Sequence, residues 1–371
     1  MSPGDAGVLP FLDLYGADFQ ARPHEVLRAY REQHFCARTP LGIAVLRYAE
    51  LQDLLAHRLF RTPATDLLTM QGITTGPMVE LMSALLLNSH GETHDRLRRL
   101  VSRAFTLRSV ESFRPRIAAI ASELLDDIAP RGSCDFMADF AEPYSSRVLF
   151  EFVGIPLTAM EKITKWNADI VLMFGFEAAA NAPRIEATLR EIGSFVDELA
   201  AQRRREPRAD LISALVTAED ASNLLTPAEL RAMMITLLSA GTGTVSRQLG
   251  SGLAAFVEHP AQWQALAENR QLAAPAVEEV IRYSSSVIVG LPRLSTEALL
   301  WNGLQLERGA CLVPIPGAAN RDPAVFTDPE RFDITQQRRS HLTLGGASTT
   351  AWGRRWAGRS CKRRCCCWRS G

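Results

Sequence analysis

The stretch from 225 to 256, LTPAELRAMMITLLSAGTGTVSRQLGSGLAAF, limits the possible folds of this chain more than any other. Thr226, Pro227 and Glu229 match a capping box with proline at the first helical position, which predicts that a helix begins here. The residues that follow are mostly apolar and continue without a turn signal. They predict one long, central helix that other helices must cover.

Two glycines lie in the middle of this helix. Gly241 and Gly243 each cost about 0.5–1 kcal/mol relative to alanine in a helix interior. One interpretation is that they let another group approach closely, or that the helix opens locally because the Thr244 hydroxyl bonds the Ala240 carbonyl one turn earlier. The other interpretation is a crossing point between two helices, with Thr244 merely bonded back to its own helix. This segment alone favours neither interpretation.

Most of the remaining chain also has a helical period. Apolar residues recur at three- and four-residue steps in 46–57, 91–106, 112–127, 182–203, 227–257 and 275–284. Short β-like runs occur at 42–46 and 310–315, and turn signals separate the other segments. We therefore expect one mainly α domain with a minor β-sheet portion.

Composition narrows the class of protein. The 371 residues carry a formal net charge of +0, so charge gives no argument for nucleic acid or an anionic membrane as a partner. No apolar run reaches the roughly 18–20 residues that a membrane span needs. The N-terminus lacks the basic and apolar regions of a signal peptide. We expect a cytoplasmic protein with neither nucleic acid nor membrane as partner.

The segment GETHDRLRRLVSRAFT places a histidine and an arginine on a face that should be buried. At about 100° per residue, His94, Arg98, Val101 and Phe105 share one side of the helix. Burying an arginine without a partner is costly, which predicts an anionic group under this face. The alternative is an arginine whose stem packs while its head reaches water, and the segment alone favours that alternative.

A second charged pattern follows near the C-terminal third of the chain. Glu279 and Arg282 are three residues apart, so they face each other on a helix. For an isolated pair, a surface ion pair contributing less than about 1 kcal/mol is the simpler interpretation. Arg293 lies in an expected strand and Arg331 in the motif PERF, and neither indicates a role by itself.

Taken together and in order, these segments resemble the cytochrome P-450 monooxygenases in their soluble bacterial form, over about residues 30–346. HDRLR is similar to the family's helix that holds a haem propionate. AGTGT is similar to its oxygen-binding groove, and EVIR is similar to its Glu-x-x-Arg pair, which an arginine in PERF completes. The resemblance implies haem contacts at His94, Arg98, Arg293 and His341, an oxygen groove at Ala240, Gly241, Gly243 and Thr244, with Thr244 as the proton-relay alcohol, and an ion triad of Glu279, Arg282 and Arg331.

The resemblance also implies a reaction. Such enzymes insert one atom of dioxygen into a bound organic substrate, using haem b and two electrons that NAD(P)H supplies through ferredoxin and ferredoxin reductase. The expected pocket walls, 72–89, Leu237–Thr244 and Val287–Leu291, are mostly apolar. They fit a small hydrophobic metabolite of secondary metabolism, such as a polyketide, terpenoid or peptide intermediate.

Two positions depart from the family pattern. Gly243 replaces the usual acid before the relay threonine, so water must deliver protons there or oxygen activation is poorly coupled. Leu344, Gly345 and Gly346 begin the family's Phe-Gly-x-Gly-x-His-x-Cys-x-Gly loop, but Ala351 occupies the cysteine position, which leaves no metal ligand there. The thiolate is the ligand that favours O–O cleavage.

A single-nucleotide frameshift explains the second departure. Codons permitted for residues 346–353, read one nucleotide earlier, encode Gly-Ile-His-His-Cys-Leu-Gly. Three leucine codons read out of frame likewise become the run Cys365–Cys367. We therefore expect a cytochrome P-450-like domain at 1–346 and a frameshifted tail at 347–371. Zinc binding by the tail cysteines is disfavoured, because adjacent cysteines lack the usual ligand spacing.

Three functional hypotheses remain from the sequence. The gene encodes a working monooxygenase and this sequence contains an error, or the frameshift is real and the product is an inactive remnant. The third is a helical protein that binds haem or a hydrophobic ligand without oxygen chemistry.

Resequencing the gene around codon 346 tests the frameshift. We expect a one-nucleotide difference there that brings a cysteine codon into frame with the preceding family motif. Genomic reads that reproduce the present tail on independent DNA would rule out a sequencing error and leave the remnant and the binding protein.

Overall fold

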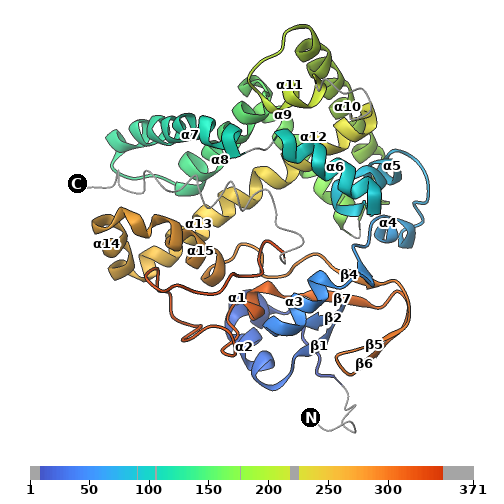
Figure 1. Ribbon diagram of the computed structural model, residues 1–371, viewed down its shortest axis with the longest axis vertical. Coiled ribbons are helices and arrows are strands. Elements are labelled where there is room, and N and C mark those ends of the chain that lie inside the picture. The colour runs from blue at the N-terminus through green and yellow to red at the C-terminus, as the bar shows by residue number, and fades with distance from the viewer. Residues whose placement is uncertain (1–8, 90, 105–106, 176, 218–224, 346–371) are drawn as a thin grey trace. The chain divides into compact units, whose positions relative to one another are not determined.

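The computed structural model describes residues 9–345 apart from 90, 105–106, 176 and 218–224, and it leaves the side chains of 103–108 and 240 undescribed. The chain divides into two compact units. We call Pro63–Gly250 the helical unit, and we call the chain up to Thr62 together with the chain from Ser251 the mixed unit. Helices predominate and the strands are few and short, so the predicted fold class is confirmed (Figure 1).

The helical unit contains no strand among its described residues. Its main elements are α4 (Asp66–Met70), α5 (Pro77–Ala84), η1 (Leu86–Asn88), α6 (Gly91–Ala104), α7 (Leu107–Ile128), η2 (Ala129–Arg131), the π-helix η3 (Phe136–Ala141), α8 (Glu142–Val153), η4 (Leu157–Ala159), α9 (Met160–Val171), η5 (Leu172–Phe174), α10 (Ala182–Arg205), α11 (Leu211–Val216) and α12 (Pro227–Gly241). The next helix, α13 (Gly243–Glu258), starts in this unit and ends in the mixed unit.

The mixed unit holds both sheets. Its elements are α1 (Ala17–Ala21), α2 (Pro23–Gln33), β1 (Cys36–Thr39), β2 (Gly42–Val45), α3 (Tyr48–Ala56), β3 (Phe60–Arg61), α14 (Pro260–Glu268), η7 (Arg270–Leu272), α15 (Ala273–Tyr283), β4 (Arg293–Ser295), β5 (Leu299–Trp301), β6 (Leu304–Leu306), β7 (Cys311–Pro314) and α16 (Pro316–Ala319). The larger sheet has the strand order β1-β2-β7-β4-β3, and β5 pairs with β6 alone.

Pairing in the larger sheet joins a strand near the N-terminus to a strand from the C-terminal third of the chain. β2 runs parallel to β7, with Ile43 opposite Leu312, whereas the other neighbours in this sheet are antiparallel. The β5–β6 hairpin turns at Asn302 and Gly303, whose φ angles of 47° and 83° are the left-handed values that a tight hairpin of this kind requires. Both strands expected from the sequence, at 42–46 and 310–315, are confirmed as β2 and β7.

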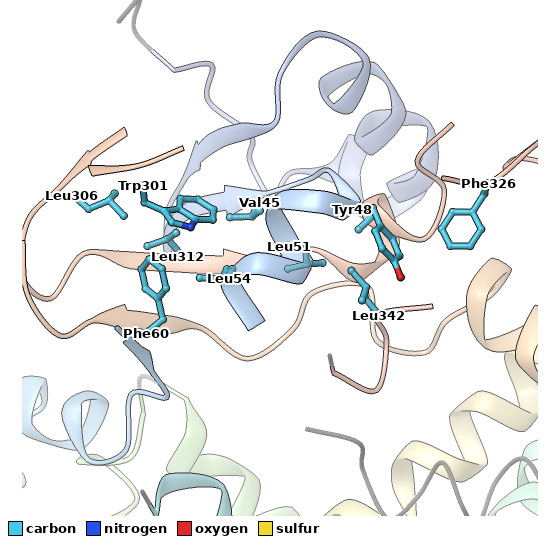
Figure 2. Close-up of a cluster of buried hydrophobic side chains, with 11 residues drawn as sticks. Val45, Tyr48, Leu51, Leu54, Phe60, Trp301, Leu306, Leu312, Phe326 and Leu342 are labelled. Atoms are coloured by element: carbon cyan, nitrogen blue, oxygen red, sulfur yellow. The ribbon is translucent and has the colours of Figure 1, made fainter. Parts of the chain in front are cut away.

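A buried hydrophobic cluster packs α3 against the sheet (Figure 2). Leu51 and Leu312 are fully buried in it, and Trp301 is 3% exposed. The Trp301 ring meets Phe60 edge to face with centroids 5.7 Å apart, and its indole nitrogen donates a hydrogen bond of 2.7 Å to Asp53. The indole thus buries its apolar area without leaving its N–H unsatisfied.

The helix starts follow the sequence signals. Thr226 accepts a hydrogen bond from the Glu229 amide, and the Glu229 carboxylate accepts one from the Thr226 amide, so the predicted capping box is confirmed. The helices expected at 46–57, 182–203 and 275–284 appear as α3, α10 and α15 with shifts of at most two residues. Among the described residues, no helix combines the length and apolar character needed to cross a membrane.

Truncating Leu312 tests the cluster in Figure 2. Leu312→Ala should lower the free energy of unfolding by about 2–5 kcal/mol, because it leaves a cavity in a fully buried site. Leu300→Ala is the matched control, since Leu300 lies in β5 of the same unit but is 70% exposed, and it should change stability by less than about 0.5 kcal/mol. Chemical denaturation followed by circular dichroism measures both. Equal losses would contradict the assigned core.

Candidate functional site

Helix α6 presents the first group of expected site residues. Val101 is fully buried, as the shared face predicted, whereas His94 and Arg98 are only partly buried. The His94 Nδ1 atom lies 3.2 Å from an Asp95 carboxylate oxygen, and the His94 side chain is 31% exposed. Phe105, the fourth residue expected on this face, lies outside the described residues. The face is therefore apolar at its C-terminal part and basic at its N-terminal part.

The long central helix is two helices. Predicted as one run over 227–257, it breaks at Thr242 between α12 and α13. The Leu238 carbonyl accepts a hydrogen bond of 3.2 Å from the Thr242 hydroxyl and another of 3.4 Å from the Asn167 amide on α9. The expected distortion is thus present, and a side chain from α9 contributes to it. The bond expected from Thr244 to the Ala240 carbonyl stays a prediction.

The two glycines have different neighbours. A Cβ atom on Gly241 would lie 2.9 Å from a methyl carbon of Leu149 on α8, so the Leu149 side chain would have to move to admit any larger residue where the two helices meet. This supports the helix-crossing interpretation for Gly241. A Cβ atom on Gly243 would lie 3.2 Å from the Arg247 guanidinium, one turn further along α13. A cation therefore stands next to the position where the family pattern has an acid.

The mixed unit contains the expected ion pair in a buried setting. The Arg282 Nε atom donates a hydrogen bond of 2.7 Å to Glu279, and both side chains are at most 3% exposed. Arg282 also donates to the backbone carbonyls of Asn320, Pro329 and Arg331, at 3.0, 2.8 and 3.1 Å. The simpler reading of this pair as a surface contact is therefore wrong.

The prediction that Arg331 is the third member of the ion triad is also wrong. The Arg331 side chain is 64% exposed and lies 3.6 Å from Asp333, and only its backbone carbonyl reaches the pair. Arg338 takes the place instead, with its Nε atom 3.1 Å from Glu279 and its side chain 8% exposed. Burial and the nearby charge of Arg282 lower the pKa of Arg338, against the opposing effect of Glu279. The turn containing PERF directs its arginine outward, which its spacing could not reveal.

Arg293 is a desolvated cation at the start of β4. Its guanidinium donates hydrogen bonds of 3.3 and 3.2 Å to the carbonyls of Leu291 and Pro292, and burial lowers its pKa. Within the part of the chain that the structure describes, it pairs with no carboxylate. Two neutral carbonyls at these distances compensate a desolvated guanidinium incompletely, so this position suits an anionic group.

His341 is the other expected contact in the mixed unit. Its side chain is 1% exposed, and its Nε2 atom lies 3.4 Å from a Glu278 carboxylate oxygen. His341 lies on the segment that leads toward the expected metal loop. A buried imidazole at this position is suited to contact an acidic group. One acidic neighbour of His341 in the described chain is Glu278, which is itself 45% exposed.

Two of the three described cysteines, Cys36 and Cys311, are poor candidates for a metal ligand. Burial, more than the nearby Glu50, raises the pKa of Cys36 to about 12, and burial also raises the pKa of Cys311. Such thiols stay protonated, whereas a metal ligand must be a thiolate. Over the described residues, no group of three or more histidine, cysteine or acidic side chains could hold a metal ion. Ala351 and the expected loop lie outside those residues.

The expected residues therefore divide between the two units. Those in the helical unit are His94, Arg98, Ala240, Gly241, Gly243 and Thr244. Those in the mixed unit are Glu279, Arg282, Arg293, Arg331 and His341. The basic side chains among them could bind the acidic propionate groups of haem. Sequence reasoning missed Arg338 and Asn167, because neither occurs in a motif and both act through contacts distant in sequence.

Known protein families and sequences show where this chain belongs. The family described as Cytochrome P450 matches residues 76–337. Luteothin monooxygenase of Streptomyces thioluteus is 33% identical over 342 residues, covering 91% of this chain and 83% of that protein. The polyketide biosynthesis cytochrome P450 PksS of Bacillus subtilis is 30% identical, covering 89% of this chain and 84% of that protein.

Solved structures give the same result. The crystal structure of CalO2 aligns with a TM-score of 0.87 and 26% identity, covering 95% of this chain and 90% of that one. P450BioI, in complex with hexadec-9Z-enoic acid ligated acyl carrier protein, aligns with a TM-score of 0.83 and 28% identity, covering 94% and 90%.

Two arginine variants test the corrected ion cluster. Arg338→Ala should lower the free energy of unfolding by about 3 kcal/mol, because Glu279 then loses a buried cationic neighbour. Arg331→Ala should cost less than about 1 kcal/mol, since its side chain is exposed and its carbonyl remains. Urea denaturation of both variants measures the difference. A larger loss from Arg331→Ala would restore the arrangement expected from the sequence.

Proposed function

The chain belongs to the cytochrome P450 family, and from that premise we propose that it derives from a haem-dependent monooxygenase of secondary metabolism whose substrate is a small hydrophobic polyketide. Family members are monooxygenases that use haem and draw electrons from a redox partner. The names of relatives support the substrate class, since they include mycinamicin IV hydroxylase/epoxidase and 6-deoxyerythronolide B hydroxylase.

The observation that carries this proposal is the Arg293 guanidinium. Burial lowers its pKa, yet its described partners are two backbone carbonyls. A haem propionate would supply the missing negative charge. The same role is proposed for His341 in the mixed unit, and for His94 and Arg98 on α6 in the helical unit.

The remaining site residues have two proposed roles: some line the oxygen groove and others stabilise the structure around the site. When bound, haem supplies the activation of dioxygen. We assign Thr244 to hold a proton at its hydroxyl for the reaction, and Ala240, Gly241 and Gly243 to line the groove where α12 ends. Gly241 also lies at the crossing with α8, which is compatible with the proposed groove. Glu279 and Arg282, with Arg338, support the segment 320–331 from inside the mixed unit.

The expected partners follow from this chemistry. We propose haem b as the cofactor, NAD(P)H as the electron source, and ferredoxin with its reductase as the carrier, in the cytoplasm. The apolar character of the walls at 72–89, Leu237–Thr244 and Val287–Leu291 supports a hydrophobic substrate. P450BioI was crystallised with a fatty acid on its carrier protein, which supports a chain-like hydrophobic group as the part that enters the site.

The tail determines whether the present chain is active. We propose that residues 1–346 form the family domain and that 347–371 arose by frameshift, with Ala351 in the cysteine position. One specific observation favours the inactive remnant as the second candidate: the described thiols at Cys36 and Cys311 lie in strands of the sheet and have raised pKa values, which disfavours them as substitutes for the missing ligand. Haem retention without oxygen chemistry is then the residual property.

Haem titration of the purified full chain tests the proposal. We expect uptake of haem, and we expect Arg293→Ala to raise its dissociation constant by about tenfold, because a charged contact to a propionate is lost. Arg308→Ala is the matched control, since Arg308 is exposed in the same unit, and it should leave the affinity unchanged.

The iron spectrum separates the candidates. The reduced chain with carbon monoxide should lack the thiolate-type Soret band, and the same chain with the reading frame restored should show it. A full chain that takes up no haem would refute the proposed cofactor. A thiolate-type band from the present chain would refute the frameshift as the cause of lost ligation.

A further inference from the structure

One carboxylate serves two helices of the helical unit. Glu229 Oε2 accepts a hydrogen bond of 2.9 Å from the Thr226 amide, which closes the capping box of α12. Glu229 Oε1 accepts a charge-assisted hydrogen bond from the Arg96 guanidinium on α6. The side chains are 16% and 32% exposed, so the pair is partly shielded from water. This contact ties α6 to the first turn of α12, two elements of the same unit (Figure 1).

Arg96 lies on the opposite flank of α6 from the expected haem contacts. At about 100° per residue, Arg96 is roughly 160–200° around the helix from His94 and Arg98. The stripe containing Leu97 and Leu100, which are 3% and 8% exposed, runs between the two flanks. The helix thus has an apolar stripe against the unit's interior, an ion pair on one side and two basic residues on the other.

The apolar stripe alone does not fix the rotation of α6. Hydrophobic contact is non-directional, so a modest turn about the helix axis costs little apolar area. A charge-assisted hydrogen bond has a preferred distance and angle, so it resists such a turn. α6 packs against α11 and η1, and the Arg96–Glu229 pair adds a directional contact at its N-terminal half.

We propose that Arg96 is a positioning residue for haem. By holding one flank of α6 to the capped start of α12, the Arg96–Glu229 pair sets the angle at which His94 and Arg98 are presented. This inference rests on the proposed function, in which those two side chains hold a propionate. Arg96 itself faces away from them and contacts Glu229, so its effect on haem acts through the helix.

The pair can be removed without removing the cap. Gln is as suitable as Glu at the third position of a capping box, so Glu229→Gln keeps the hydrogen bond to the Thr226 amide and loses the charge. Thr226→Ala does the reverse, because it weakens the cap and keeps the pair. Arg96→Lys keeps a cation within reach of the carboxylate. Arg99→Ala removes an exposed arginine from the same helix and serves as the charge control.

The experiment measures haem affinity of the full-length chain, prepared free of haem, by titration with haemin at the Soret band. Arg96→Ala and Glu229→Gln should each raise the dissociation constant by about three- to tenfold, and the double variant should add no further loss. Arg96→Lys should recover most of the affinity. Thr226→Ala should lower the thermal midpoint yet leave haem affinity unchanged, and Arg99→Ala should change neither.

Circular dichroism of the bound haem supplies a second readout. Its sign and intensity report how the porphyrin is seated, so Arg96→Ala should alter this band at saturating haem whereas Thr226→Ala should not. Haem binding by the unmodified chain with unchanged affinity and dichroism in Arg96→Ala would overturn this assignment alone. An unmodified chain that binds no haem would overturn the proposed function and the assignment together. Equal effects of Thr226→Ala and Arg96→Ala would reduce Arg96 to a general stabilising contact.

Discussion

The buried pair of Glu279 and Arg282 is the interaction on which the mixed unit depends. Removing two charges from water costs several kcal/mol, and only close pairing with further hydrogen bonds compensates that cost. Arg282 meets this condition by donating to three carbonyls in the segment 320–331 as well as to Glu279. A segment with little regular structure is thereby fixed against α15. Arg338 completes the arrangement from outside the expected motif.

The helical unit depends on a different constraint, the interruption of its longest helical segment. Gly241 allows α8 to approach through Leu149, and the next residue, Thr242, turns its hydroxyl back to the Leu238 carbonyl. Asn167 from α9 bonds the same carbonyl. The place where the helix opens is therefore also the place where two other helices contact it. The helix break and the helix crossing therefore involve adjacent residues, Gly241 and Thr242.

The basic side chains fit the chemistry of a haem protein more fully than the thiols do. Arg293 is a partly buried cation with carbonyl partners and His341 is deeply buried, both features that suit an acidic ligand edge. Cys36 and Cys311 have raised pKa values, which suits structural thiols in a sheet. In the proposed assignment these basic side chains hold the family cofactor, and Ala351 occupies the sequence position expected for the cysteine ligand.

The sequence by itself determined where helices such as α10 and α15 lie, where the capping box at Thr226 stands, and which family the chain resembles. These properties are local, because helical period, capping and motif spacing depend on residues a few positions apart. Tertiary structure alone decided that Arg338 rather than Arg331 approaches Glu279, and that Arg96 holds Glu229. Both outcomes depend on the direction in which a side chain leaves its turn or helix, and on a partner tens or more than a hundred residues away. The spacing of residues along the chain therefore predicts neither the direction of the side chain nor its distant partner.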